Sequence, residues 1–68
     1  MTINKRLLKS KMAEEGVTQS YLADRLKLSK STLSLKLNNN RFFTIEEMFC
    51  VVDVLNIENA EIKKFFLA

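Results

Sequence analysis

The polar groups best suited to chemistry in this 68-residue sequence lie close together, between residues 29 and 41. They are ammonium, guanidinium, hydroxyl and amide groups, contributed by Lys30, Ser31, Thr32, Ser34, Lys36, residues 38–40 (all Asn) and Arg41. Such groups bind a partner through hydrogen bonds and positive charge. We expect most of them, including Lys36, to lie on the outer surface of one short polar helix that begins after Ser29.

The composition removes most catalytic chemistry. The chain has no histidine, which takes away the commonest general base and every Ser–His or Cys–His nucleophile pair. One cysteine, Cys50, cannot form an internal disulfide or, without histidine, a zinc site. We expect Cys50 to be a small buried or half-buried hydrophobic residue. Since no paired carboxylates stand at a catalytic spacing either, we expect no enzyme activity, no metal and no cofactor.

Charge is divided unevenly along the chain. Residues 1–41 carry nine Lys or Arg and three Asp or Glu, whereas residues 42–68 carry two Lys and five Asp or Glu. This division indicates that the first part meets a polyanion. A solvated surface with chance clustering of charge would give the same pattern, so charge alone does not decide between the two interpretations.

An all-α fold follows from composition and periodicity. The chain has no proline and one glycine, with 47% hydrophobic and 28% charged residues, so it holds few helix breakers. Five short amphipathic helices are expected to begin near residues 3, 19, 30, 45 and 59. None would be stable alone, so they must bury their apolar stripes on one another. We expect a compact five-helix bundle that forms a single domain over residues 1–68.

Boundary signals support these helices. Gly16 is a natural left-handed position after the first helix, and Thr18 and Ser29 are N-cap candidates for the second and third. The fourth begins at Thr44 with the Thr-x-x-Glu spacing of a capping box. Its helical period is the strongest in the chain, and Phe49 lies in its apolar stripe, so we expect Phe49 to be buried.

The second and third predicted helices are separated only by a brief turn. The second buries Leu22 and Leu26 on one face, and the third returns Leu33 and Leu37 to the same core. This is the spacing of a helix-turn-helix over about residues 18–38, in which the second helix can project its polar face outward.

The string TQSYLADRLKLSKSTLSLKLN, residues 18–38, resembles the helix-turn-helix of phage repressors and Cro-like proteins, the Cro/CI or XRE-like family. The resemblance covers nearly the whole chain, which is similar to the short single-domain members. It implies a lambda-repressor-like fold and a transcriptional regulator that occupies an operator in double-stranded DNA, as a repressor does. Lys27 stands where the family commonly has glycine, so it either takes a positive φ at some cost or reshapes the turn. Asn39 also stands where many members have glycine, and asparagine tolerates that conformation.

The resemblance assigns roles to individual residues. The third helix would enter the major groove by its N-terminus and place Lys30, Ser31 and Ser34 at base edges. Leu35 would either pack on a thymine methyl group or lie against another helix of the fold. Phosphate contacts are implied for Gln19, Thr32, Asn38, Asn40 and Arg41. Without the motif, these are ordinary solvated residues of a surface helix and its loops.

One such domain offers few base contacts, so we expect a two-fold homodimer, completed on DNA. Phe65, Phe66 and Leu67 are the expected dimer interface, because one helix cannot bury three consecutive large apolar residues. A small helical protein–protein module, such as an antirepressor or adaptor, is the alternative function. We expect a cytoplasmic protein with no membrane segment, because no apolar run approaches the roughly 18–20 residues of a span. We expect no small-molecule ligand.

Overall fold

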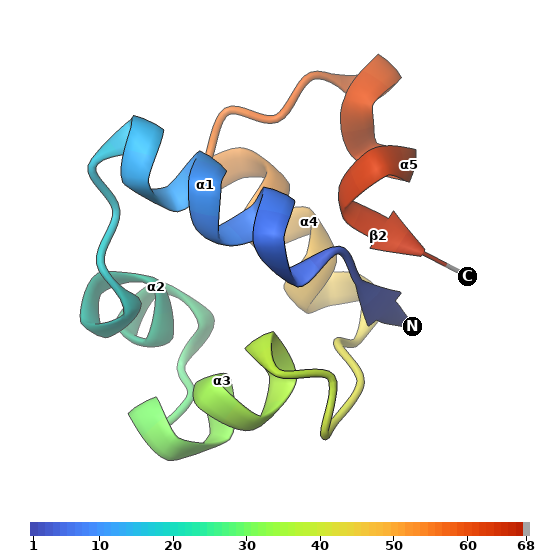
Figure 1. The fold of residues 1–68 in the computed structure, drawn as a ribbon. Coiled ribbons are helices and arrows are strands. Elements are labelled where there is room, and N and C mark those ends of the chain that lie inside the picture. The colour runs from blue at the N-terminus through green and yellow to red at the C-terminus, as the bar shows by residue number, and fades with distance from the viewer. Residues whose placement is uncertain (68) are drawn as a thin grey trace.

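Five α-helices make up most of the structure, a computed structural model that describes residues 1–67 (Figure 1). In chain order they are α1 (Lys5–Glu15), α2 (Gln19–Leu26), α3 (Lys30–Leu37), α4 (Ile45–Val54) and α5 (Ile62–Phe65). A 3-10 turn, η1 (Asn59–Glu61), leads into α5. The prediction of a small, mostly helical domain with five helices is confirmed. Within residues 1–67, no helix is long and apolar enough to cross a membrane.

Local side-chain chemistry sets where the helices begin. Four helices follow a residue whose side chain accepts a hydrogen bond from a first-turn backbone N–H: Asn4, Thr18, Ser29 and Thr44. The Glu47 carboxylate also accepts from the backbone N–H of Thr44, which completes the predicted capping box. Gly16 follows α1 in the left-handed conformation with φ 69°. These boundaries are therefore encoded within a few residues of each helix end.

The helices enclose one apolar core. Its fully buried side chains are Leu8, Leu22, Leu33, Leu37, Val51 and Leu55. In this core α2 packs against α3 and α4, while α1 packs against α5. The predicted burial of Leu33 is confirmed.

The predicted burial of Phe49 is wrong, because its side chain is 60% exposed. Val51 and Leu55 of the same helix face the core instead. Two residues along an α-helix correspond to about 200° of rotation, so a helix that points Val51 inward must point Phe49 outward.

The two ends of the described chain meet in a short antiparallel sheet that the sequence did not predict. Strands β1 (Thr2–Ile3) and β2 (Phe66–Leu67) pair with Ile3 opposite Phe66. The first helix therefore begins at Lys5 rather than near residue 3, and the last ends at Phe65.

This sheet changes the role expected of the C-terminal aromatic residues. Phe65 and Phe66 are 6% and 7% exposed, and the Phe66 ring packs edge-on against Phe43 with centroids 5.9 Å apart. Both belong to the core and are not available to a partner, which corrects the predicted dimer interface. Leu67 remains 43% exposed. Phe66 can be buried while Leu67 is exposed, because successive side chains of a strand point to opposite faces.

Candidate nucleic-acid interface

A three-residue turn connects α2 to α3 and fixes how the two helices meet. Lys27 adopts the left-handed conformation with φ 58°, and its N–H donates to the carbonyl of Asp24 at 3.1 Å. The N–H of Leu28 donates to the carbonyl of Ala23 at 2.9 Å, and the Leu28 side chain packs against the core. Ser29 then caps α3. The turn therefore keeps a positive φ at Lys27, at the cost that a non-glycine residue bears there.

The inner face of α3 holds a charged residue that was expected on its outer surface. Lys36 is only 8% exposed, and its Nζ donates to the Glu47 carboxylate at the start of α4. The same Nζ lies 5.9 Å from the centroid of the Phe43 ring. Lys36 comes three residues after the buried Leu33, which puts both on one face of the helix. This spacing from a core leucine is the feature of the sequence that could have predicted the burial of Lys36.

The ion pair fixes the C-terminal half of α3 to the N-terminus of α4. Partial burial raises the pKa of Glu47, but hydrogen bonds from Lys36 and from the Thr44 backbone, together with the Lys36 charge, lower the pKa more. Taken together, these effects put the pKa of Glu47 below the ordinary value for a glutamate. The carboxylate is therefore charged near neutral pH and holds the Lys36 ammonium group in place.

The outer face of α3 is polar at its start and apolar further along. Lys30 and Ser31 are exposed in the first turn. Leu35, four residues after Ser31, is 41% exposed and lies on the same face. Ser34 is half-buried at the edge of this face. The structure thus brings together the four residues predicted to contact bases, and it leaves Leu35 facing solvent rather than another helix of the fold.

The residues predicted to contact phosphates fall into two groups. Gln19 and Thr32 lie in the first turns of α2 and α3, and both are half-buried. The Thr32 hydroxyl accepts a hydrogen bond from the Ser29 hydroxyl at 2.9 Å and keeps its own proton to donate. The first turn of a helix also carries backbone N–H groups and the positive end of the helix dipole, both of which favour anions.

The second group follows α3. The Asn38 side-chain amide donates to the Ser34 carbonyl at 2.8 Å, so part of its hydrogen-bonding capacity is used inside the protein. Asn40 and Arg41 are exposed. Between them and Asn38, Asn39 takes a positive φ of 61°.

Asn39 clamps this loop to β1. Its Oδ1 accepts from the backbone N–H of Ile3 at 2.9 Å, and its Nδ2 donates to the Ile3 carbonyl at 3.1 Å. The side-chain amide thus satisfies both outer-edge backbone groups of Ile3, as a third strand would. The clamp fixes the loop that presents Asn40 and Arg41.

Basic side chains dominate the surface around α2 and α3. Between residues 19 and 41 the exposed charges are Arg25, Lys27, Lys30 and Arg41, with Asp24 as the one acidic residue. Within residues 1–67, no three potential metal-ligating side chains gather into a group.

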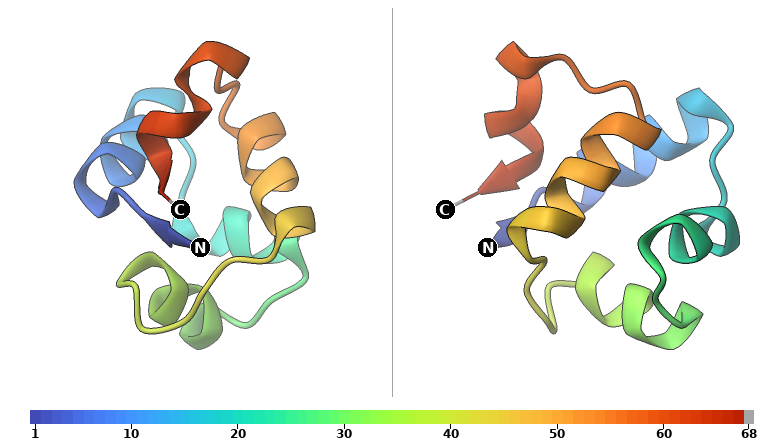
Figure 2. Two further views of the ribbon diagram at one scale, coloured as in Figure 1. Left: turned by 90° about the vertical axis from the view of Figure 1, so that its right-hand side faces the viewer. Right: turned by 180° about the vertical axis from the view of Figure 1, so that it is seen from behind.

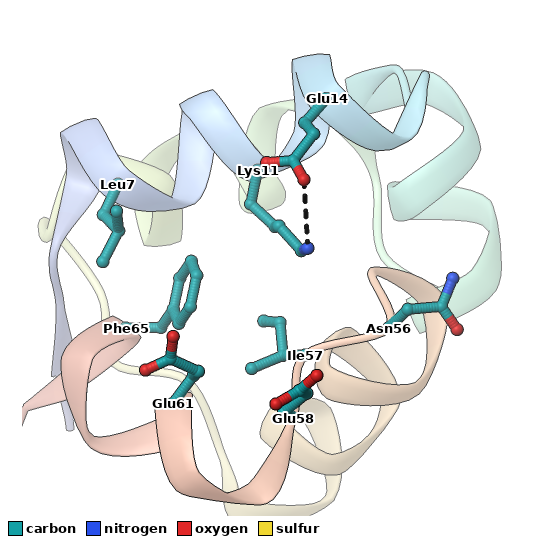
Figure 3. A pocket seen from close by; sticks show the side chains of 8 residues that line it. All are labelled: Leu7, Lys11, Glu14, Asn56, Ile57, Glu58, Glu61 and Phe65. Carbon is teal, nitrogen blue, oxygen red and sulfur yellow. Dashed lines mark ion pairs between the residues drawn. The ribbon is translucent and has the colours of Figure 1, made fainter.

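A pocket lies away from α3, between α1 and the η1–α5 segment (Figure 3). It has a volume of about 350 Å³ and an apolar lining from Leu7, Ile57 and Phe65. Lys11, Asn56 and three glutamates complete its walls. Since acidic groups outnumber basic ones there, the pocket is unsuited to a polyanion and is separate from the candidate interface.

The features above define a small helical domain with an exposed polar helix in a basic setting. The whole chain, residues 1–68, matches the family described as a protein of unknown function, DUF739. The protein therefore belongs to the DUF739 family. No curated protein and no solved structure matches the chain.

Proposed function

We propose that the protein is a sequence-specific DNA-binding transcriptional regulator in which α2, the turn and α3 form a helix-turn-helix of the lambda-repressor type. The observation that carries the proposal is the contrast between the two faces of α3. One face is anchored in the core by Leu33, Leu37 and the Lys36 ion pair, and the other exposes Lys30, Ser31 and Leu35 to solvent. A helix anchored on one side and polar on the other suits insertion into a groove.

The dimensions of α3 agree with major-groove binding. A helix with its side chains is about 10–12 Å across, and the major groove of B-DNA is about 12 Å wide. Lys30 would donate to guanine O6 and N7, and Ser31 would donate to or accept from a base edge. Leu35, exposed further along the same face, would pack on a thymine methyl group.

Phosphate contacts would fix the orientation of α3. Gln19 and Thr32 would donate to one strand near the positive ends of α2 and α3. Asn40 and Arg41 would donate to the backbone beyond the other end of α3, where the Asn39 clamp holds their loop. Asn38 would have only part of its amide left for DNA, because it already donates to Ser34.

We further propose that the protein acts as a repressor by occupying its operator. Occupancy requires only binding, and no catalytic step. The alternative function, a small protein–protein module, is favoured by one observation: Leu35 is an apolar residue in the middle of the outer face of α3.

Selection of bound fragments from random duplex DNA, followed by sequencing, tests the proposal. We expect one sequence to be enriched. Lys30→Ala and Ser31→Ala should keep the fold, since both side chains are exposed, and should each relax preference at one or two base pairs by about 1–3 kcal/mol. Arg41→Ala should weaken binding to all sequences alike and reduce the slope of log affinity against log salt by about one unit.

Two results would reject DNA binding. One is the absence of any enriched sequence, and the other is an affinity for DNA that does not change with salt. If Leu35→Ser then abolished capture of a protein partner, the protein–protein module would be the better account.

A further inference from the structure

Three large apolar side chains around the start of α4 are exposed for no reason internal to the fold. Phe42, Ile45 and Phe49 are 65%, 59% and 60% exposed. Ile45 and Phe49 are four residues apart on α4 and share one face. Phe42 lies in the loop three residues before Ile45. We call these three residues the α4 patch. Several large apolar side chains exposed within eight residues of a small domain mark a contact surface.

We infer that the α4 patch is the contact between two copies of this protein, related by a two-fold axis and bound side by side on DNA. The inference rests on the proposed function, because that function requires a second copy to read a second half-site. It also replaces the C-terminal interface expected from the sequence, where Phe65 and Phe66 are buried.

The size of the patch fits a weak dimer. An aromatic side chain has about 150–250 Å² of surface, so three large side chains exposed by about three-fifths offer roughly 350 Å² per copy. A stable protein–protein interface buries about 800 Å² per partner. The patch therefore supplies the apolar centre of an interface but not enough area for a tight complex. Such a dimer would form mainly when DNA holds both copies.

The patch is complementary to itself when two α4 helices run antiparallel. With the two-fold axis midway between Ile45 and Phe49, each Ile45 packs on Phe49 of the other copy. The apolar side chains of the patch are therefore complementary to one another across a two-fold axis.

The position of the patch relative to α3 suits adjacent half-sites. The loop and the start of α4 follow the C-terminal end of α3, at the opposite end of that helix from its N-terminus (Figure 2). The domain measures 29 × 25 × 21 Å, which sets the separation of two touching copies. To reach successive major grooves, about 34–36 Å apart, the two α3 helices must lie further apart than the centres of two touching domains.

The test compares three variants on the selected operator, on a duplex carrying one half-site, and free in solution. Phe49→Ser and Ile45→Ser remove the patch, and Leu67→Ser is the matched control, because Leu67 is another exposed apolar residue, 43% accessible. All three substitutions are at exposed positions, so melting temperatures should stay within a few degrees of wild type. We expect the patch variants to lose cooperative binding and at least about tenfold in affinity for the full operator. Binding to the half-site duplex should be unchanged, and Leu67→Ser should match wild type on both duplexes.

Other outcomes separate the inference from the proposed function. If the patch variants still place two copies on the operator with wild-type affinity, or if Leu67→Ser alone disrupts the dimer, the α4 contact is refuted and DNA binding stands. If the wild type binds its operator as one copy, the contact is refuted as well. If no duplex is bound, but sedimentation shows self-association that Phe49→Ser removes, the contact stands and DNA binding fails.

Discussion

The ion pair between Lys36 and Glu47 gives the sharpest test of how α3 is held. In Glu47→Gln the side-chain amide oxygen can still accept from the Thr44 backbone N–H, which lies 2.9 Å from the carboxylate in the wild type. The capping box is therefore preserved, since glutamine serves there as well as glutamate. The substitution removes the negative charge opposite an ammonium group that has little access to water.

The expected cost lies between two limits. An exposed ion pair contributes about 0–1 kcal/mol, and removing one partner of a buried pair costs about 3–5 kcal/mol. The Lys36 and Glu47 side chains are 9% and 15% exposed, which is nearer the buried limit. We expect Glu47→Gln to lower the free energy of unfolding by about 2–3 kcal/mol. For a domain of this size that is a fall of about 10–20 °C in the melting temperature.

The dependence on pH gives a second signature. Because the pKa of Glu47 is lowered in the folded protein, its contribution to stability is complete above the ordinary glutamate pKa and is lost as pH falls through the folded value. The wild type should therefore lose its advantage over Glu47→Gln as the pH drops below about 4.5, the ordinary value. Urea unfolding followed by circular dichroism at neutral and acid pH measures both effects.

Glu46→Gln is the matched control, because it removes one acidic charge from an exposed position in the same first turn. It should cost no more than about 0.3–1 kcal/mol, the usual size of a helix-dipole effect. The stabilising role of the ion pair is refuted if Glu47→Gln lowers the free energy of unfolding no more than Glu46→Gln does. It is refuted equally if the difference between wild type and Glu47→Gln is the same at neutral and acid pH.

Three further substitutions test the packing, the clamp and the turn by urea unfolding. Leu33→Ala should lower the free energy of unfolding by about 2–5 kcal/mol, because the Leu33 side chain is fully buried, and it should leave the chain largely unfolded at 37 °C. A melting temperature close to that of the wild type would contradict the burial. Asn39→Gly keeps the positive φ but removes two hydrogen bonds to Ile3, so it should lower the free energy of unfolding by about 1–3 kcal/mol. An unchanged free energy of unfolding would mean that water replaces the Asn39 side chain. Lys27→Gly should stabilise by about 1 kcal/mol, because glycine avoids the strain at φ 58°; destabilisation would show that the Lys27 side chain contributes more than its backbone costs.

The parts of the fold that could be predicted are those encoded locally. Thr18, Ser29 and Thr44 mark helix starts because each side chain bonds to its own first turn. Gly16 marks a helix end for a similarly local reason. The β1–β2 pair was missed because it depends on contact between residues about sixty positions apart, for which two-residue strands give no periodic signal.

The exposed residues of the candidate site could be predicted from the sequence, but the buried contacts that hold them in place could not. The residues with exposed polar groups in the first turn of α3 lie together as expected. Phe49 was assigned to the wrong side because α4 is apolar on more than one face, and periodicity alone does not say which face is inward. Lys36 was assigned outward because lysine is almost never buried unless it is paired, and its partner is eleven residues away on another helix.

These two errors lie at one junction. Lys36 and Glu47 join the end of α3 to the first turn of α4, and that turn begins the helix that carries Ile45 and Phe49. Under the proposed function, a buried ion pair would thus link the helix that reads DNA to the surface that pairs two copies. Such a link would hold the two recognition helices at a fixed spacing, because the helices cannot shift without separating a charge from its partner. Local sequence rules fail where a charge is buried or an apolar face is exposed, and under the proposed function both departures lie at functional positions. Glu47→Gln should therefore weaken discrimination between operators that differ only in half-site spacing, at temperatures where the variant is still folded.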